Sequence, residues 1–384
     1  MSESISQNPL DVISCHDSKT QVLTDRGFKF FSELDGSERL ATVNPETAEL
    51  FFEVPTQIIH SHYQGLMYCV TNQSLNFRIT PEHKMLIRKW NERKRTLNER
   101  YEFIKAKDLG WYVGLMNRVQ WNSAIQKETF TLPGVNHKLK EQRESKDIDL
   151  KAWVRFLGIY LAEGTMLKRD QKVGVVSYKV QIAAFKEREK TIVRETLKEI
   201  GITPLELVDR FTFHNRRLYE AMESLELAGV KAGKKFVPAF IFLLHAEIIR
   251  EFLVGHFAGD GCEQHGMRAH YTSSPKLASD LQALIFISGD ETRMSVRQAR
   301  SSTMTDGRHV VGTLPEHRVS VCERKTLAIE RRETYFTEEY DGDVFCAEMP
   351  TYHTLVTYRE GKILISGSYD AGLTSDLWTI RTVA

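Results

Sequence analysis

The stretch Phe252–Gly261, FLVGHFAGDG, decides the fold because it places glycines at an unusual spacing inside an apolar run. Gly255 and Gly259 lie four residues apart, just before Asp260. A glycine in a helix interior costs roughly 0.5 to 1 kcal/mol relative to alanine. Residues four apart share one helix face, so two missing side chains let a second helix approach almost backbone to backbone. The stretch therefore predicts a helix that packs closely against another helix.

A near copy of this stretch lies upstream, at Phe156–Thr165, with the sequence FLGIYLAEGT. Gly158 and Ala162 have the same four-residue spacing and precede Glu163. The chain between the two copies is long enough for one compact α+β unit, which indicates an internal repeat. If the two helices cross along their small-residue faces, their C-terminal ends meet, and Glu163 and Asp260 meet with them.

The segments that follow each copy alternate between strand and helix patterns. After the first copy come VVSYKVQIAAF as a strand, the amphipathic helix EREKTIVRETLKEIGI, the strands PLELVDR and FTFHN, and the helix RRLYEAMESLEL. After the second copy come HYTSS, SPKLASDLQALIFISG, TRMSVRQARS and HRVSVCE. This order predicts two copies of a unit made of a helix, two strands, a second helix and two more strands.

Strand patterns occupy both ends of the chain. From Cys15 to Trp90 the short apolar runs TQVLT, RLATVNP, LMYCVTN and FRITPEHKMLI are separated by turn residues, and strands return between 336 and 366. The sequence thus predicts a mixed fold, in which an α+β domain of two pseudo-symmetric repeats is inserted into an all-β domain.

Composition excludes several classes of protein. The chain has 384 residues and 41% hydrophobic residues, which is enough for real cores. Its five cysteines form neither a CxxC pair nor a metal-finger spacing, which argues against a disulfide framework and structural zinc. The polar start and the absence of a long apolar run predict no export signal and no membrane partner, so we expect a cytoplasmic protein.

Between Lys84 and Asp108, nine basic residues stand against four acidic ones. A solvated face is slightly favoured over nucleic-acid contact for this run.

Two carboxylates at abutting helix ends have a chemical consequence. Each would lie at the negative end of a helix dipole and beside a like charge, and both effects disfavour ionisation. A hard Mg²⁺ ion resolves this conflict, because it takes carboxylate oxygens, water and substrate phosphate. A single G-x-x-x-[AG]-[DE]-G pattern is more often an ordinary glycine-capped helix end. Two copies in matching context favour a metal-assisted phosphodiester hydrolase.

With these motifs, residues 150–335 resemble a two-repeat LAGLIDADG homing endonuclease. LGIYLAEG and VGHFAGDG stand at its two signature motifs. The resemblance implies a saddle of antiparallel strands in the major groove of double-stranded DNA, a long asymmetric target site, and Mg²⁺-dependent cleavage that leaves short 3′ overhangs. We expect a monomer. The implied catalytic and metal-binding carboxylates are Glu163 and Asp260, with Gly164 and Gly261 beside the metals. Strand residues that would face bases or phosphates are Lys179, Gln181 and Arg297.

The all-β segments carry a second set of reactive residues. Cys15 opens the first segment, Thr80 and His83 stand three apart, and Cys346 and His353 lie near the end of the second. A thiol, histidines and a hydroxyl are the parts needed for acyl transfer. Taken singly, each has a structural explanation, as a buried thiol, a hydrogen-bonded core residue or a surface residue.

Together these residues resemble the split halves of an intein's Hint splicing domain, at residues 15–100 and 336–368. The resemblance implies that the Cys15 thiol attacks the Ser14 carbonyl in an N-to-S acyl shift. Thr80 and His83 match the TxxH motif that strains and protonates that amide, and Cys346 lies where the family often has Asp or Cys. His353 falls within the following motif. Residues 1–14 and 369–384 would be remnants of the host protein, and 101–149 a linker or a small DNA-contacting insert.

One position departs from the family pattern. Inteins usually end on an asparagine that cyclises, whereas ISGSYDAG has Ser368 at that place, or Ser368 is the downstream nucleophile and the asparagine is missing. Serine forms no succinimide, so we predict that complete splicing is blocked and that cleavage before Cys15 remains. Two alternatives stay open: a self-processing element whose nuclease has decayed, and an RNA-binding maturase. The surviving pair of acids argues against the first, and the acyl-transfer residues argue against the second.

Overall fold

The computed structural model describes residues 14–123, 125–137, 140–171, 175–299, 301–303, 309–311, 313–322, 326–330 and 334–369. The chain divides into two compact units. Unit 1 comprises residues 1–122, 289–293 and 323–384, and unit 2 comprises residues 123–288 and 294–322. The host remnants expected at the two ends lie outside the described residues, apart from Ser14 and Tyr369. The segment 101–149 divides at residue 122 between the two units.

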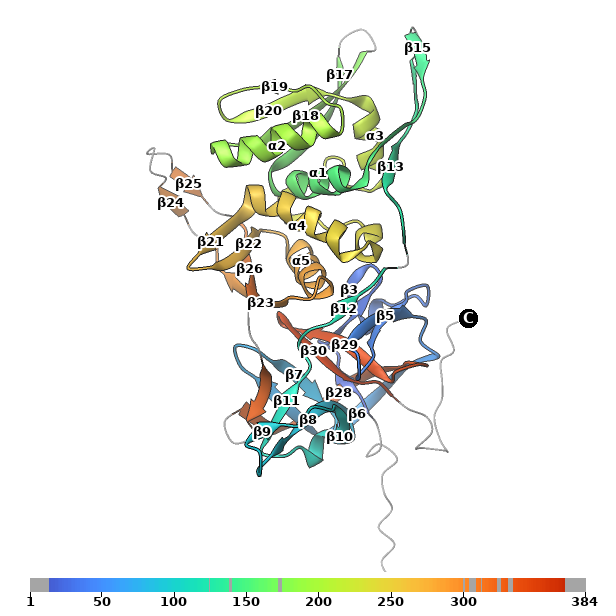
Figure 1. The fold of residues 1–384 in the computed structure, drawn as a ribbon, viewed down its shortest axis with the longest axis vertical. Helices are drawn as coiled ribbons and strands as arrows, with labels where there is room; N and C mark the ends of the chain where they lie inside the picture. Colours follow the sequence, from blue (N-terminus) through green and yellow to red (C-terminus); the bar gives the residue numbers. More distant parts are fainter. Residues whose placement is uncertain are drawn as a thin grey trace, which may run out of the picture. The chain divides into compact units, whose positions relative to one another are not determined.

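Unit 1 is built almost entirely of strands (Figure 1). They are β1 (His16–Asp17), β2 (Gln21–Thr24), β3 (Gly27–Phe30), β4 (Leu40–Val43), β5 (Glu49–Glu53), β6 (Gln57–Thr71), β7 (Asn76–Ile79), β8 (Lys84–Asn91), β9 (Thr96–Leu97), β10 (Glu102–Lys105), β11 (Tyr112–Leu115), β12 (Gln120–Trp121), β27 (Leu327–Glu330), β28 (Tyr335–Glu348), β29 (Thr354–Arg359) and β30 (Lys362–Gly367). Two short 3₁₀ turns, η2 (Phe31–Glu33) and η3 (Ala106–Asp108), interrupt them.

The strands of unit 1 bring the two ends of the chain together. Strands β1, β28, β6 and β7 close into a barrel, and the long strands β6 and β28 pair in antiparallel register along their whole length. His16 in β1 pairs with Phe345 in β28 and with Ile79 in β7. A second sheet has the order β12-β5-β4-β2-β29-β30, and a third has the order β10-β8-β11-β27. The first residues of the all-β domain therefore lie against strands from its C-terminal part.

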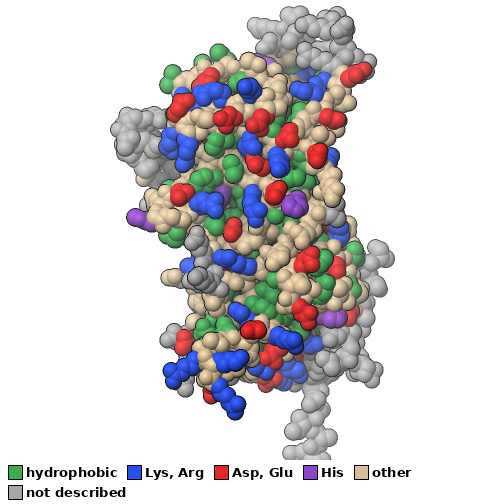
Figure 2. All heavy atoms as spheres, in the orientation of Figure 1, with side chains coloured by type: hydrophobic (Ala, Val, Ile, Leu, Met, Phe, Trp, Pro, Cys, Tyr) green, Lys and Arg blue, Asp and Glu red, His purple; other side chains and the backbone are tan. Residues whose placement is uncertain are grey.

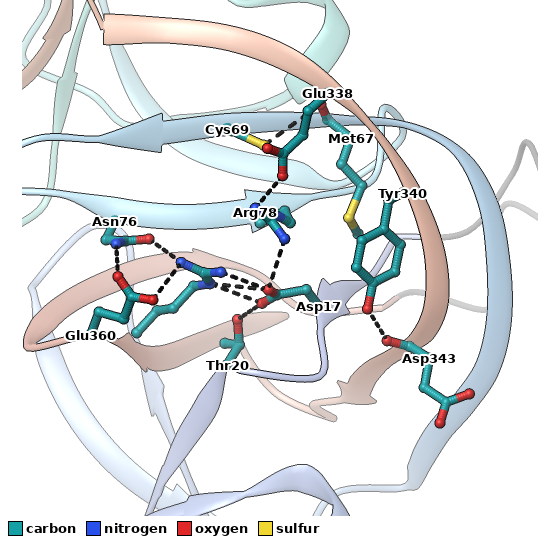
Figure 3. A network of polar contacts seen from close by, with 11 residues as sticks. Asp17, Thr20, Met67, Cys69, Asn76, Arg78, Glu338, Tyr340, Asp343 and Glu360 are labelled. Atoms are coloured by element: carbon teal, nitrogen blue, oxygen red, sulfur yellow. Dashed lines mark hydrogen bonds and ion pairs between the residues drawn. The ribbon is translucent and has the colours of Figure 1, made fainter.

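A buried ion-pair network fixes β1 against β29 (Figure 3). The Arg359 guanidinium donates to both carboxylate oxygens of Asp17, with Nε at 3.1 Å from each and Nη2 at 2.9 Å from Oδ2. Asp17 also accepts from Thr20 Oγ1 at 2.7 Å. A bidentate arginine–carboxylate pair is strong and directional. It holds the backbone two residues after Cys15 at a defined place in the barrel.

Unit 2 mixes helices and strands. Its helices are α1 (Leu150–Glu163), α2 (Glu187–Glu199), α3 (Arg216–Ser224), α4 (Ala246–Asp260) and α5 (Pro275–Ile287), with the 3₁₀ turns η4 (Ala232–Lys234) and η5 (Ala239–Leu243). Its strands are β13 (Thr129–Leu132), β14 (Val135–His137), β15 (Lys140–Arg143), β16 (Lys146–Asp149), β17 (Gly164–Gln171), β18 (Val175–Ala183), β19 (Leu205–Glu206), β20 (Arg210–His214), β21 (Gly261–Gln264), β22 (Met267–Thr272), β24 (Ser301–Thr303), β25 (His309–Val311) and β26 (Glu316–Cys322), and β23 (Glu291–Arg297) runs into it from unit 1.

The elements of unit 2 follow the same order after α1 and after α4. Each helix leads directly into an antiparallel strand pair, β17–β18 or β21–β22, and then into a second helix, α2 or α5. The sheet orders are β17-β18-β20-β19 and β21-β22-β26-β23. The hairpin β24–β25 is an addition to the second set, and the hairpins β13–β16 and β14–β15 precede α1.

The helices α1 and α4 cross at the glycines. Together they form the most extensive helix–helix contact among the described residues. A Cβ atom added to Gly158 would lie 2.1 Å from the Phe252 carbonyl oxygen, and one added to Gly255 would lie 2.1 Å from the Arg155 carbonyl oxygen. At Gly259 an added Cβ would meet Glu163 Cγ at 2.6 Å. The backbone-to-backbone approach predicted from the glycine spacing is therefore present.

This approach makes a testable prediction about stability. Gly→Ala in a helix interior ordinarily gains roughly 0.5 to 1 kcal/mol. We expect Gly255→Ala instead to lower the free energy of unfolding of unit 2 by about 3 kcal/mol, because the added methyl group collides with a backbone oxygen that cannot rotate away. Val254→Ala is the matched control, since Val254 is exposed on the same helix. Chemical denaturation measures both variants, and a stabilised Gly255→Ala protein would contradict the close crossing.

Two candidate active sites

The first candidate site lies where α1 and α4 end. Glu163 is the last residue of α1 and Asp260 is the last residue of α4. Both helices begin with a side-chain cap, in which Asp149 accepts from Ala152 N at 2.8 Å and His245 accepts from Glu247 N at 3.4 Å. Because the glycine faces fix how the helices cross, each carboxylate emerges beside the other helix end.

The two carboxylates interact electrostatically. Burial, with the Glu163 charge as the next largest cause, raises the pKa of Asp260 from 3.8 to about 7. Burial also raises the pKa of Glu163. Two half-buried carboxylates that repel each other store unfavourable energy when both are ionised. The conflict expected from the two helix termini is thus present in the folded chain.

A buried lysine lies beside the pair. Lys235, which follows η4, donates from Nζ to the carbonyl oxygens of Tyr160, Leu161 and Gly164 at 3.1, 3.0 and 3.2 Å. It therefore adds a donor to the backbone acceptors around the C-terminus of α1, where most carbonyls lack an intrahelical partner. Burial lowers the pKa of Lys235 to about 8, although the charges of Asp260 and Glu163 oppose that shift. The charge of Lys235 lowers the pKa of both acids.

The donor chemistry of this site fits a hard divalent cation. Two carboxylates share one buried ammonium group, so the site has an excess of negative charge that a divalent cation would neutralise. The described residues contain no cluster of three or more His, Cys, Asp and Glu side chains that would hold a metal by themselves. Backbone carbonyls, water and substrate oxygens would complete the coordination. Gly164 and Gly261 start the strands after each acid, and the Gly164 carbonyl already accepts from Lys235.

The sheet β17-β18-β20-β19 presents polar side chains on one face. Lys179 and Gln181 lie on the same face of β18, and they pair with His214 and Thr212 of β20. Val180 and Ile182, which alternate with them, are buried on the other face. This alternation gives β18 a polar face and a core face. Arg297 at the end of β23 is exposed and lies 3.9 Å from Glu316. Lys179 and Gln181 are half-buried, and Arg297 is exposed.

The second candidate site surrounds Cys15 in unit 1. The Cys15 amide nitrogen donates to Thr80 Oγ1 at 2.9 Å, and the Thr80 amide nitrogen donates to the Cys15 carbonyl oxygen at 3.0 Å. His83 Nδ1 lies 3.3 Å from Ser14 Oγ, and its Nε2 lies 3.0 Å from Ser366 Oγ. Thr80 and His83 come together because the His83 amide nitrogen bonds back to the Thr80 carbonyl oxygen in a tight turn between β7 and β8.

The C-terminal residues of this site have different environments. Cys346 is buried in the same apolar cluster as Cys15. Ser368 is also buried, with Oγ donating to the Tyr369 carbonyl oxygen at 3.1 Å and its amide nitrogen donating to the His353 carbonyl oxygen at 2.8 Å. The His353 side chain is exposed, and its backbone has a positive φ of 51°. The structure therefore brings Cys15, Thr80 and His83 together and leaves the His353 ring at the surface.

Burial controls ionisation throughout the second site. It raises the pKa of Cys15 well above its ordinary value, and the neighbouring Cys346 adds to that shift. Burial lowers the pKa of His83 well below its ordinary value, so the imidazole is neutral near pH 7. The resting site thus pairs a protonated thiol with a neutral imidazole, which is a proton acceptor.

The neighbouring His16 predicts an acid-sensitive unit 1. Its ring is fully buried, stacks on Phe31, and has no hydrogen-bond partner at either nitrogen among the described residues. Burial lowers the pKa of His16 from 6.5 to about 4. A folded-state pKa below the unfolded value gives stability that is present above pH 6.5 and is lost as the pH falls toward 4. Full protonation corresponds to about 3 kcal/mol.

We therefore expect His16→Phe to flatten the fall in melting temperature of unit 1 between pH 7 and pH 4. Thermal melts followed by circular dichroism at half-unit pH steps measure this effect. His60→Phe is the matched control, because the His60 side chain is exposed. If wild type and His16→Phe lost stability in parallel over this range, burial of neutral His16 would not be a source of the acid sensitivity.

Sequence reasoning missed several residues of both sites. The sequence around Lys235 carries no motif that marks it, because its partners are backbone carbonyls of the distant helix α1. Ser366 and His16 also lie next to His83 through strand pairing alone. A lone serine or histidine in a strand pattern is ordinarily structural, and only the register of β1 and β30 distinguishes these two.

Comparisons with known proteins place the chain among diverse relatives. No family model matches it. It is 24% identical over 300 residues to an ATP-dependent Clp protease proteolytic subunit of Chlamydomonas moewusii, covering 75% of this chain and 29% of that protein. It is 22% identical over 383 residues to a DNA-directed RNA polymerase subunit beta C-terminal section of Stigeoclonium helveticum, covering 88% and 35%. A DNA polymerase II large subunit of Thermococcus kodakarensis is 26% identical over 175 residues, covering 45% and 10%. The chain thus spans 35% or less of these relatives' own lengths.

Similar solved structures include homing endonucleases and an intein. The homing endonuclease I-DmoI in complex with DNA and Ca is 11% identical, with a TM-score of 0.33, covering 46% of this chain and 84% of that chain. The AceL NrdHF class 3 split intein is 14% identical, with a TM-score of 0.23, covering 35% and 76%. The I-LtrWI LAGLIDADG homing endonuclease bound to target DNA is 11% identical, with a TM-score of 0.22, covering 44% and 78%.

Proposed function

We propose that unit 2 is a site-specific endonuclease that hydrolyses both strands of double-stranded DNA with Mg²⁺. The observation that carries the proposal is the delivery of Glu163 and Asp260 to one place by the crossing of α1 and α4. Each acid is the last residue of its helix. Burial raises the pKa of both acids, and the charge of Glu163 raises the pKa of Asp260 further. Two buried carboxylates repel each other when no cation is bound. A pair of this kind is suited to holding cations and a phosphate.

The residues of unit 2 have separable roles in this proposal. Glu163 and Asp260 would hold Mg²⁺, together with the backbone beside Gly164 and Gly261. When bound, the cation supplies electrostatic stabilisation of the attacking and leaving oxygens of the scissile phosphate. Lys235 holds the end of α1 in place through its carbonyls and adds a positive charge beside the acids. Lys179 and Gln181 on the polar face of β18 would orient the duplex.

Site-specific cutting can be tested with a defined DNA substrate. If residues 15–368 are encoded by an insertion in a host gene, the target of unit 2 is the host gene without that insertion. In this DNA the codons for residues 1–14 are joined directly to those for residues 369–384. We expect the chain with Mg²⁺ to cut this duplex near the join. A duplex of equal length, in which the codons around residues 14–15 continue into the insertion, should remain intact because it lacks the joined site. Equal cleavage of both duplexes, or of neither, would contradict site-specific cutting at the insertion point.

A second function is proposed for unit 1, on the contacts of Cys15. The thiol of Cys15 would attack the Ser14 carbonyl carbon, form a thioester, and break the bond to its own amide nitrogen. The proton lost by sulfur ends on that nitrogen, so the step is an isomerisation that needs no added reagent. Neutral His83 would carry the proton, and Thr80 would hold the amide through its hydroxyl oxygen. Ser368 offers no amide for cyclisation, and the proposal therefore stops at cleavage before Cys15.

A further inference from the structure

A basic loop of unit 1 has no role in either proposed activity. The turn between β8 and β9 and the segment after β9 carry four cations, which we call the basic tip: Arg93, Lys94, Arg95 and Arg100. All four side chains are exposed, and none has an ion pair among the described residues. Glu92 and Glu99 lie in the same loop, so the loop keeps a net positive charge.

Neighbouring cations on the same sheet differ, because they are neutralised. Lys89 lies 2.9 Å from Glu102, and Lys105 lies 2.6 Å from Glu82, which also pairs with Lys107. The positive charge of this sheet is therefore concentrated at the basic tip. Figure 2 shows lysine and arginine side chains gathered over β8 and β9. Exposed cations without partners repel one another, so these four residues do not stabilise the fold.

An aromatic cluster supports the base of this hairpin. Trp90 at the end of β8 meets Trp111 and Tyr112 edge to face, with ring centroids 6.1 and 5.3 Å apart. Arg88 lies over the ring of Tyr101 at 5.2 Å. Trp111 itself remains 51% exposed. The hairpin is thus anchored at its base by packed rings and presents its cations outward.

We propose that the basic tip binds the phosphate backbone of double-stranded DNA, so that unit 1 contributes to DNA affinity independently of the candidate nuclease site. Four exposed cations on an anchored hairpin are complementary in charge to a polyphosphate, and such contacts add affinity without sequence preference. The choice of duplex DNA as the occupant rests on the proposed function of unit 2. The contact itself requires only the charges and the exposure of the tip.

The test measures binding without cleavage. The full chain is titrated against a fluorescent 40-base-pair duplex of arbitrary sequence in EDTA, from 50 to 200 mM KCl. Compared with wild type, the Arg93→Ala/Lys94→Ala/Arg95→Ala/Arg100→Ala variant should bind at least about tenfold more weakly at low salt. The slope of log K against log salt should fall by about 0.9 for each phosphate contact removed, and thus by about 3 to 4.

A charge-preserving variant separates electrostatics from folding. Arg93→Lys/Arg95→Lys/Arg100→Lys keeps every cation and should keep wild-type affinity and slope. An alanine variant with unchanged affinity and slope would overturn the proposal, and so would a lysine variant that loses as much as the alanine variant. Tighter binding of a 40-nucleotide single strand than of the duplex would overturn the assignment to duplex DNA.

The outcome is distinguishable from a failure of the nuclease. At saturating protein, the alanine variant should still cut the joined host duplex at the wild-type rate, because saturation compensates for the lost affinity and the acids of unit 2 are unchanged. A chain that never cuts DNA but loses affinity on removal of the tip would refute the nuclease alone. A chain that cuts normally and shows no change in affinity would refute the basic tip alone.

Discussion

Glu163→Gln and Asp260→Asn are each expected to reduce Mg²⁺-dependent cleavage of the joined host duplex by about 10³-fold or more. Each change keeps the size of the side chain and removes the charge that would hold a cation at the phosphate. Because the two acids act on one shared site, the double variant should be little worse than either single variant. Single-turnover cleavage with excess protein measures the chemical step for all three variants.

The matched control is Glu247→Gln. Glu247 is an exposed carboxylate in the first turn of α4, at the opposite end of the same helix from Asp260. It should cut at the wild-type rate. Glu163→Gln and Asp260→Asn each remove the repulsion between the two carboxylates. Each single variant should therefore melt at or above the wild-type temperature in the absence of divalent ions. Cleavage that survives either change at the wild-type rate would remove the proposed role of that acid.

Cys15→Ala is expected to abolish thiol-induced release of the N-terminal segment completely. In wild type, dithiothreitol should intercept the thioester between Ser14 and Cys15 and free residues 1–14, which mass spectrometry detects. Without the thiol no thioester forms, so the cleavage has no other route in this site. Thr80→Val should slow the release by about 10²-fold, because Thr80 Oγ1 accepts the Cys15 amide proton and orients the scissile bond.

The control for the second experiment is Cys69→Ala, which removes another buried cysteine of unit 1 and no partner of the Cys15–Thr80 hydrogen bonds. Its release should match wild type. Equal release from wild type and Cys15→Ala would refute the assignment of the nucleophile. Replacing Ser368 by Asn with a cysteine in place of Tyr369 should add cleavage at the C-terminal junction, and its absence would mean that Ser368 is not the sole defect.

The parts of the fold that could be predicted are those with local patterns. The four-residue spacing of small residues that begins at Gly158 in one helix and at Gly255 in the other predicted the α1–α4 crossing. A missing side chain on a helix face has few other uses. The run VVSYKVQIAAF predicted a strand at the place of β18. Thr80 and His83 were recognisable because they lie in one turn and carry a motif at fixed spacing.

The parts that could not be predicted depend on contacts between distant segments. Lys235 reaches four carbonyls at the end of α1 and the start of β17 from more than 70 residues further along the chain, and no pattern in either segment encodes these contacts. The fork between Arg359 and Asp17 exists because β1 and β29 belong to one domain interrupted by the insertion. The division of 101–149 at residue 122 likewise follows from pairing of β11 with β8 and β27, strands far apart in the chain.

The central claim is that one acid from each motif holds a common cation. Anomalous diffraction from crystals of the chain grown with Mn²⁺ tests it most directly. The account predicts a strong anomalous peak at the ends of α1 and α4, about 2 Å from carboxylate oxygens of both Glu163 and Asp260. That peak should vanish in crystals of Glu163→Gln. Peaks bound to only one acid, or an unchanged peak in the variant, would contradict the account.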